Sequence, residues 1–331
     1  MEESTVIKGP TADPRPTAVV LGASHWHALL YRDGLARRFR VTTVQDIDLE
    51  VARRLAEPLG ASVAASVDQA LNGDDIDVVF VFSPHHQMPA IAQQLIDRRI
   101  PFVIEKPAGT NLDDLRRIEK QARLTGVAAT VPLVQREAPV DTWLSRAGDI
   151  VYERMAFIAG PASRYRRNGN PWMLDPARSG GGSLMNLGPH FVDMAIRHIG
   201  HPSDVVRRLS TALHGEGVDD HATLILTTST GREAIVEVGY AFPDSPLKRY
   251  CSFSASGSNG FASVDSDGNA SFTNQQGVTE GSVLEVDSDP LYDVFVDRVA
   301  DTLEKGFAGM PTLAELVETM EVIWSSDEGG R

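Results

Sequence analysis

Residues 17–46 read TAVVLGASHWHALLYRDGLARRFRVTTVQD, and this stretch decides the class of fold. It opens with an apolar run of strand length, turns at Gly22, passes through a segment of helical composition and reaches a second apolar run that ends at Asp46. A strand, a glycine turn, a helix and a second strand within about thirty residues are typical of the first unit of a parallel sheet with crossover helices. The stretch therefore predicts the start of a dinucleotide-binding fold.

The same alternation of short apolar runs and helical stretches continues to about Val131. Further strands are predicted at 61–64, 77–82, 101–104 and 128–131, and helices at 49–59, 89–97 and 112–125. The run over 77–82 is apolar without interruption, as expected for a strand that is buried on both faces. Residues 17–131 are thus predicted to form an α/β domain of the Rossmann type.

Beyond Pro132 the predicted strands alternate apolar and polar residues and follow one another directly, which indicates antiparallel pairing with one packed face. Strands are predicted at 223–227 and 234–238, and helices at 184–198 and 293–305. Residues 132–331 are therefore predicted to form an α+β domain that binds the substrate, with a mainly antiparallel sheet. Residues 1–16 are polar and proline-rich, and we expect them to form a flexible extension.

The composition narrows the possible partners. The chain has 331 residues, of which 42% are hydrophobic and 23% charged, and a formal net charge of -14 at pH 7. Such a negative field repels phosphate backbones and anionic lipid surfaces, so neither a nucleic acid nor a membrane is expected as a partner. The single cysteine, Cys251, excludes an internal disulfide and a cysteine-based metal cluster. No apolar run is long enough to span a membrane and no signal peptide is evident, so we expect a cytoplasmic protein with a small-molecule substrate.

The loop after the first strand carries predicted cofactor contacts. In the usual G-x-G-x-x-G pattern the glycines let the backbone approach a diphosphate, but here only Gly22 is kept, and Ser24 and His27 replace the others. Asp46 follows the second strand, where a carboxylate can accept hydrogen bonds from ribose hydroxyls and repels a 2'-phosphate. We therefore expect NAD rather than NADP, bound by Gly22, Ser24, His25, Trp26 and Asp46. The alternatives are a strand–turn–helix without a ligand and a helix-capping role for Asp46.

Three motifs further along the chain resemble those of one enzyme family. They are Ser83-Pro84-His85-His86 after a predicted strand, Glu105-Lys106-Pro107 after another, and the run GGGSLMNLGPHFVD over 180–193. In this order they resemble the glucose-fructose oxidoreductase and inositol dehydrogenase family, often written Gfo/Idh/MocA. The resemblance extends from Thr17 to about Trp324. It implies a Rossmann domain followed by an open sheet through which subunits pair, so a homodimer or homotetramer is expected.

The resemblance also implies roles for particular residues. Lys106 and His190 correspond to the catalytic lysine and histidine of the family, and Asn186 stands where the family has an aspartate. Further cofactor contacts are then expected at Ser83, Pro84, His86, Glu105 and Lys106. The glycines before the helix that carries His190 are expected to give the backbone room beside the nicotinamide.

The residue types fit the oxidation of a secondary alcohol. A histidine with an ordinary pKa near ~6.5 can take the hydroxyl proton while hydride leaves the same carbon, and Lys106 can stabilise the developing alkoxide. Asn186 and His190 are four residues apart on a predicted helix and share one face. The expected substrate contacts are Arg136, Arg164, Trp172, Asn186 and His190. The segment 164–172 mixes cationic and aromatic residues, which suits either a sugar ring or a carboxylated one, or else a solvated loop.

The predicted function is an NAD-dependent oxidoreductase that transfers hydride between nicotinamide and a secondary hydroxyl or carbonyl of a sugar, sugar acid or cyclitol. Three alternatives use the same residues: an NAD-assisted glycosidase or lyase, a redox-silent regulatory protein that binds NAD and a sugar, and an imine or ring reductase. No metal is expected, because the pairs His25/His27 and His85/His86 lack a carboxylate and histidine set at ligand spacing.

Overall fold

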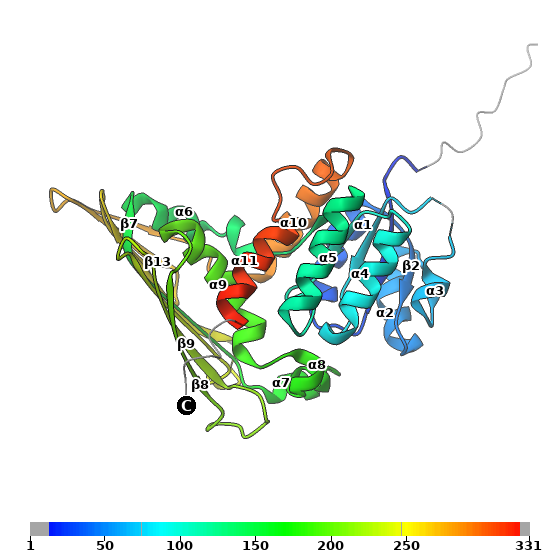
Figure 1. The fold of residues 1–331 in the computed structure, drawn as a ribbon, viewed down its shortest axis with the longest axis horizontal. Coiled ribbons are helices and arrows are strands. Elements are labelled where there is room, and N and C mark those ends of the chain that lie inside the picture. The colour runs from blue at the N-terminus through cyan, green and yellow to red at the C-terminus, as the bar shows by residue number, and fades with distance from the viewer. Residues whose placement is uncertain (1–12, 74, 246, 325–331) are drawn as a thin grey trace, which may run out of the picture.

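The computed structural model describes residues 13–73, 75–245 and 247–324, which form two sheets and the helices that cover them (Figure 1). Residues 1–12 of the expected N-terminal extension lie outside the described residues. The first sheet contains β1 (Thr17–Leu21), β2 (Arg40–Gln45), β3 (Ser62–Ala64), β4 (Val78–Val81), β5 (Phe102–Ile104) and β6 (Ala129–Thr130). All its strands are parallel, in the order β3-β2-β1-β4-β5-β6. The order reverses between β1 and β4, and ligands of such sheets bind outside the carboxyl ends of the strands at this point.

The helices of the first sheet end where the local sequence predicts. They are α1 (Arg32–Arg38), α2 (Leu49–Leu59), α3 (Val67–Ala70), α4 (Met88–Asp97) and α5 (Leu112–Thr125). The side chain of Asp48 caps the first turn of α2, and Gly60 ends that helix in the left-handed region at φ +65°. Asn111 and Gly126 do the same for α5, with Gly126 at φ +70°. The predicted ranges of α2 and α5 are therefore confirmed.

The helix after β1 differs from the prediction. The sequence predicts a helix that opens directly at the glycine loop, whereas α1 begins only at Arg32. Residues 22–27 form a loop that folds on itself, because the N–H of His25 bonds to the carbonyl of Gly22 and the N–H of Ala28 bonds to the carbonyl of His25. A 3-10 turn, η1 (Ala28–Tyr31), then leads into α1. The N-terminus of α1 is therefore displaced from the end of β1, where a diphosphate is expected.

The second sheet is built from the remaining strands. They are β7 (Ile150–Ala159), β8 (Asp204–Ser210), β9 (His221–Thr227), β10 (Glu233–Gly239), β11 (Arg249–Gly257), β12 (Gly260–Val264), β13 (Asn269–Asn274) and β14 (Thr279–Val283). Their order is β14-β13-β12-β11-β7-β10-β9-β8. β7 and β10 pair in parallel, and the other neighbours pair antiparallel. The prediction of a mainly antiparallel sheet is therefore confirmed.

Helices α6 (Pro139–Leu144) and α9 (Ser183–Ile199) lie on one face of the second sheet (Figure 1). The strands send alternate side chains toward this face: in β9, Ala222, Leu224 and Leu226 are fully buried, and the residues between them are partly exposed. The short helices α7 (Ser163–Arg167) and α8 (Pro176–Ser179) precede α9. The helix predicted over 184–198 is thus confirmed, and burial along most of its length fixes the positions of its side chains.

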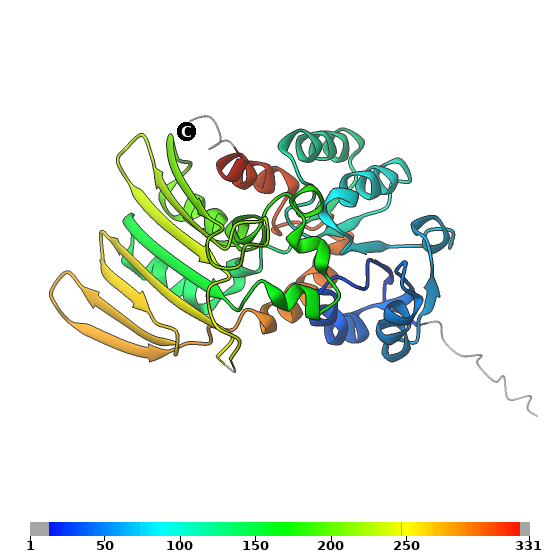
Figure 2. The same cartoon turned by 90° about the horizontal axis from the view of Figure 1, so that it is seen from below.

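The last two helices return to the first half of the molecule (Figure 2). α10 (Asp289–Thr302) packs against α1 and η1, and α11 (Leu313–Trp324) packs against α5 and α9. Arg37 of α1 lies 3.0 and 2.9 Å from the carboxylates of Asp293 and Asp297 of α10. α10 begins earlier than the prediction over 293–305, since Pro290 is tolerated in the first helical turn. The C-terminal helices thus connect the two sheets.

Candidate active site

The carboxyl ends of β1 and β2 bring together three of the predicted cofactor contacts. Gly22 has a φ of +83°, and a Cβ there would lie 2.6 Å from the backbone nitrogen of Ser83 at the end of β4. Asp46 is buried, and its carboxylate accepts hydrogen bonds from the N–H groups of Ser24 (2.7 Å) and Asp48 (3.0 Å). This edge of the sheet therefore holds a carboxylate at the position where the ribose of a dinucleotide is usually bound.

The predicted contacts that follow β4 and β5 lie at the same edge of the sheet: Ser83, Pro84, His86, Glu105 and Lys106. Glu105 and Lys106 are almost completely buried, with exposed fractions of 1% and 2%. His86 is exposed, and Ser83 is buried beside Gly22. Parallel strands end at a common edge, which explains why motifs far apart in the sequence meet here.

The side chains near this edge of the sheet fit NAD better than the backbone of the loop over 22–27 does. The indole N–H of Trp26 and the Nδ1 atom of His190 are buried and have no hydrogen-bond partner within the described ranges, and both residues line one cavity. These atoms and the carboxylate of Asp46 are suited to the polar groups of a dinucleotide. In contrast, intramolecular acceptors already engage the N–H groups of Gly22, Ala23, Ser24, His25 and His27. A diphosphate would therefore receive fewer backbone hydrogen bonds than the G-x-G-x-x-G pattern provides.

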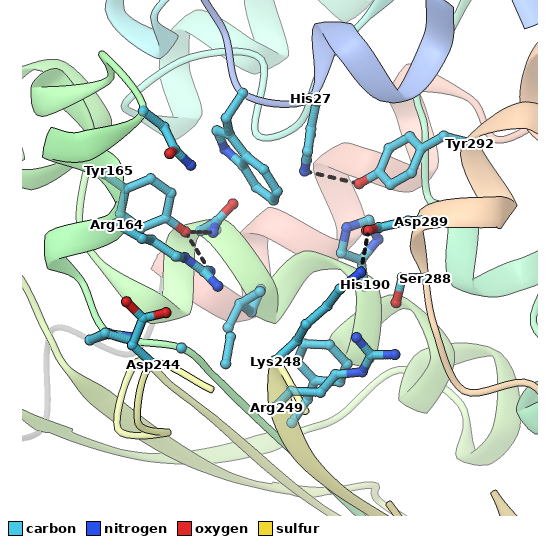
Figure 3. Close-up of a pocket in the computed structure, with 18 of the residues that line it drawn as sticks. His27, Arg164, Tyr165, His190, Asp244, Lys248, Arg249, Ser288, Asp289 and Tyr292 are labelled. Atoms are coloured by element: carbon cyan, nitrogen blue, oxygen red, sulfur yellow. Dashed lines mark hydrogen bonds and ion pairs between the residues drawn. The ribbon is translucent and has the colours of Figure 1, made fainter. Parts of the chain in front are cut away.

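A cavity of about 300 Å³ adjoins this edge and is shared by both halves of the chain (Figure 3). Its lining includes Trp26, His27 and Lys106 from the first half, and Asn186, His190 and Tyr292 from the second. The volume is at the small end of the range for small-molecule sites. The structure thus brings the three residues predicted to be catalytic, Lys106, Asn186 and His190, into the wall of one cavity.

A chain of hydrogen bonds starts at Lys106. Its Nζ atom donates to the backbone carbonyl of Asn186 (2.6 Å) and to the side-chain oxygen of the same residue (2.9 Å). The amide nitrogen of Asn186 donates to the hydroxyl of Tyr165 (2.6 Å), which also accepts from Arg164 (2.9 Å). An amide can accept and donate at once, which an ionised aspartate cannot do. Burial lowers the pKa of Lys106 to about 8, and the nearby Glu105 opposes this shift.

His190 lies one turn after Asn186 on α9 and is 7% exposed. Burial is the main cause that lowers its pKa well below the ordinary value, and the positive charge of Lys106 acts in the same direction. The imidazole of His190 is therefore neutral at pH 7. The neutral ring has the free lone pair that a general base needs.

Sequence reasoning did not find a buried cluster behind Lys106. Tyr31 donates a hydrogen bond to Glu105 (3.0 Å), and Nδ1 of His27 lies 3.0 Å from the same carboxylate oxygen. The other ring nitrogen of His27 lies 3.1 Å from the hydroxyl of Tyr292 (Figure 3). Burial raises the pKa of Glu105, although Lys106 opposes this effect. The sequence signals for this cluster were the HWH sequence near Gly22 and Glu105 in the motif with Lys106. Tyr292 belongs to α10, far along the chain.

Two predicted substrate contacts lie outside the cavity. The guanidinium of Arg136 is occupied by the carboxylates of Asp193 (2.8 and 2.5 Å) and Glu315 (2.8 Å). The ring of Trp172 is buried against that of His25, with 5.7 Å between the ring centroids, and His25 is itself buried. Arg136 and Trp172 therefore hold structural elements together, because packing and ion pairs already use their side chains.

The last glycine of the run before α9 lies against the segment that carries Asp219. A Cβ on Gly182 would collide with the backbone of Asp219, so the glycine permits a close approach between these two segments. The carboxylate of Asp219 accepts hydrogen bonds from the N–H of Gly182 (2.7 Å), the hydroxyl of Ser183 (2.7 Å) and the N–H of Leu184 (2.8 Å). Gly182 therefore makes room for the acid that caps α9. This cap fixes the start of the helix that carries Asn186 and His190.

Family models place the chain among oxidoreductases with an NAD-binding Rossmann fold. Residues 18–132 match the family model of the oxidoreductase family with this fold, and residues 146–263 match the GFO/IDH/MocA C-terminal domain. The chain belongs to the GFO/IDH/MocA family. The family indicated by the sequence motifs is therefore confirmed, and the expected cofactor NAD agrees with the matched fold.

Known proteins of similar structure support the fold. GenD2 from gentamicin A biosynthesis, solved in complex with NAD, has a TM-score of 0.80 and 22% identity, covering 99% of this chain and 98% of that one. An inositol dehydrogenase homolog from Azotobacter vinelandii, complexed with NAD+, has a TM-score of 0.80 and 17% identity, covering 98% and 99% of the two chains. The uncharacterized oxidoreductase YgjR of Escherichia coli (strain K12) is 24% identical over 200 residues, which are 57% of this chain and 59% of that protein. The match to YgjR thus spans less than two thirds of its length.

Two further observations concern the described residues. None of their helices combines the length and the apolar composition required to cross a membrane. Over 13–73, 75–245 and 247–324, no three His, Cys, Asp or Glu side chains gather in a way that could hold a metal ion.

Proposed function

We propose that the chain transfers hydride between nicotinamide and a secondary hydroxyl or carbonyl of a small polyhydroxylated molecule, a sugar, sugar acid or cyclitol. The observation that carries the proposal is the convergence of Lys106 and His190 on one cavity. Lys106 comes from the end of β5 and His190 from α9, so neither half of the chain contains the pair. Asn186 bridges them by binding Lys106 from the same helix as His190.

In the proposed oxidation, NAD, when bound, supplies the carbon that accepts the hydride. His190 is neutral at pH 7, so its free lone pair takes the proton of the substrate hydroxyl. Lys106 uses two of its N–H groups to bind Asn186, which leaves the third for the substrate oxygen. The ammonium charge stabilises the alkoxide that develops there. Asn186 orients Lys106 and cannot itself exchange a proton.

The test is turnover of NAD by the wild type and by His190→Ala and Lys106→Ala, followed as absorbance of the reduced nicotinamide over a panel of polyols and sugar acids. Each substitution should lower kcat by about two to four powers of ten. His201→Ala and Lys305→Ala are matched controls, because both residues are exposed and lie outside the cavity. Wild-type rates in His190→Ala and Lys106→Ala would remove these residues from the mechanism.

A redox-silent protein that binds NAD and a sugar is the second candidate. Two observations favour it: the loop after Gly22 has few free N–H groups, and Asn186 replaces the carboxylate of the family. In that case the wild type binds NAD in a calorimetric titration but produces no reduced nicotinamide, and Asn186→Asp restores measurable reduction. Turnover by the wild type excludes this candidate.

The domain assignment, the assembly and the location of the chain are also proposals. We propose that residues 17–131 bind the cofactor and residues 132–331 bind the substrate. The chain assembles as a homodimer or homotetramer through the face of the second sheet opposite to α9, where strand residues such as Tyr250 and Phe261 are 48% and 45% exposed. Light scattering of the wild type and of Tyr250→Glu tests this interface. A single cysteine supports a cytoplasmic location, which cell fractionation tests.

A further inference from the structure

Arg164 places a guanidinium in the wall of the cavity. It lies on α7 and is partly buried, and within the described residues the one hydrogen bond recorded for its side chain runs from Nη2 to the hydroxyl of Tyr165 (2.9 Å). Its guanidinium carbon lies 5.0, 5.7 and 5.8 Å from the ring centroids of Tyr165, Tyr240 and Trp26. A guanidinium has five N–H donors, so most of its hydrogen-bonding capacity is unused.

Two other cations of the cavity, Lys248 and Arg249, are already paired with carboxylates. Lys248 lies 3.1 and 3.0 Å from the carboxylates of Asp287 and Asp289, and Arg249 lies 3.3 Å from that of Asp287. Arg164 has no such ion pair among the residues that the structure describes. Removing a cation from water without an anionic partner is unfavourable, and aromatic faces compensate only part of this cost. The N–H groups of Arg164 that remain unused can therefore pair with an anionic group of a ligand.

The geometry points to a hydroxy acid of sugar size as the substrate, and we propose that its carboxylate pairs with Arg164. This inference rests on the proposed oxidoreductase function and adds the charge of the substrate to it. Arg164 is linked to Lys106 through the hydrogen bonds of Tyr165 and Asn186, so both cations face the same small cavity. One small molecule can then place a hydroxyl at Lys106 and His190 and a carboxylate at Arg164.

A carboxylate fits this site better than a phosphate. The planar guanidinium matches a carboxylate with two parallel hydrogen bonds. Asp244 and Asp289 line the same cavity (Figure 3), and their charges oppose a dianion more strongly than a monoanion. Arg164 adds a single positive charge, which balances one carboxylate.

The test compares acids with neutral molecules of the same carbon skeleton. kcat/KM with NAD is measured for gluconate against glucitol and for glucuronate against glucose, with glucose 6-phosphate as the phosphate arm. The wild type should prefer each acid by about tenfold to a hundredfold, which is the range for a charge-assisted pair. Arg164→Met should bring the ratio of acid to neutral substrate close to one, and Arg164→Lys should keep part of the preference. Arg166→Met is the matched control on α7, since Arg166 is exposed and pairs with Glu216 away from the cavity, and the ratio should stay as in the wild type.

Binding of propionate in the presence of NAD separates this inference from the proposed function. Propionate carries one carboxylate and no hydroxyl, so its calorimetric affinity reports the anion site without turnover. If propionate binds the wild type and binds Arg164→Met at least tenfold more weakly while no substrate is turned over, the anion site stands and the proposed function fails. Equal kcat/KM for acids and neutral partners, or an acid-to-neutral ratio that Arg164→Met leaves unchanged, overturns the anion site and leaves the oxidoreductase in place. A preference for glucose 6-phosphate over glucuronate also overturns the anion site, as does a lack of propionate binding together with a lack of turnover.

Discussion

Raising the pH from 7 to 10 should remove the positive charge of Lys106 and, with it, the stabilisation of the alkoxide. Burial lowers the pKa of this lysine to about 8, from an ordinary value of 10.5. At pH 7 about nine tenths of the side chains are then ammonium ions, against about one tenth at pH 9 and one hundredth at pH 10. kcat/KM for oxidation should therefore be about tenfold lower at pH 9 than at pH 7, and fall about tenfold more by pH 10.

The assay is the initial rate of NAD reduction at saturating NAD and constant ionic strength, with a substrate that has no group titrating between pH 7 and 10. His190 does not contribute to this limb, because its pKa lies well below 6.5 and the ring stays neutral throughout. Lys106→Arg is the control, since a guanidinium remains charged at pH 10 and the fall should disappear even if the rate is lower. A rate that rises through pH 8 to 10 would refute the reasoning and make the amine of Lys106 the base. If Lys106→Arg shows the same fall in kcat/KM between pH 7 and 10, the titrating group is not Lys106.

Three further predictions concern other residues. Asp46→Ser should reduce the ratio of NAD affinity to NADP affinity in a fluorescence titration, because the 2'-phosphate of NADP no longer meets a like charge. An unchanged ratio of the two affinities would exclude this role of Asp46. Asn186→Asp should raise the pKa of Lys106, because it places a negative charge in contact with the ammonium group. The fall of kcat/KM at high pH should then shift upward by a pH unit or more. A fall that stays at pH 8 would contradict the contact between residue 186 and Lys106. The carboxylates of Asp141 (3.0 Å) and Glu153 (2.8 Å) raise the pKa of the buried His198 to about 9 despite desolvation. Its contribution of about 3 kcal/mol to the free energy of unfolding should be complete below pH 6.5 and disappear as the pH rises through 9, and urea unfolding of His198→Gln should lack this dependence.

The elements that local sequence determines were predictable. The apolar run over 77–82 became the central strand β4, and the caps Asp48 and Asn111 set the starts of α2 and α5 where the sequence predicts them. The catalytic candidates Lys106 and His190 came from the resemblance to the family, whose motifs stand after a buried strand and after the glycine run.

Long-range contacts explain what the sequence did not reveal. Whether an arginine binds a ligand or an internal carboxylate depends on residues far along the chain: Glu315 occupies Arg136, whereas no described acid pairs with Arg164. Tyr292 reaches the cavity because α10 folds back onto α1, and no local pattern predicts this return. The late start of α1 follows from hydrogen bonds within the loop that depend on the side chains of His25 and Asp46.

The contact between Gly22 and Ser83 explains why the first glycine of the G-x-G-x-x-G pattern is kept in this chain although the other two are replaced. The loop keeps the one glycine whose missing side chain leaves room for the neighbouring strand end, with 2.6 Å between a hypothetical Cβ and the nitrogen of Ser83. That requirement is internal to the fold and persists whether or not a diphosphate is bound. The third glycine of the pattern serves close packing of the first helix against the strand, and this packing is not required in a chain whose α1 begins later. A search for distant members of this family should therefore weight the first glycine and the acid after β2 above the remainder of the motif, because a filter that demands all three glycines would discard sequences such as this one.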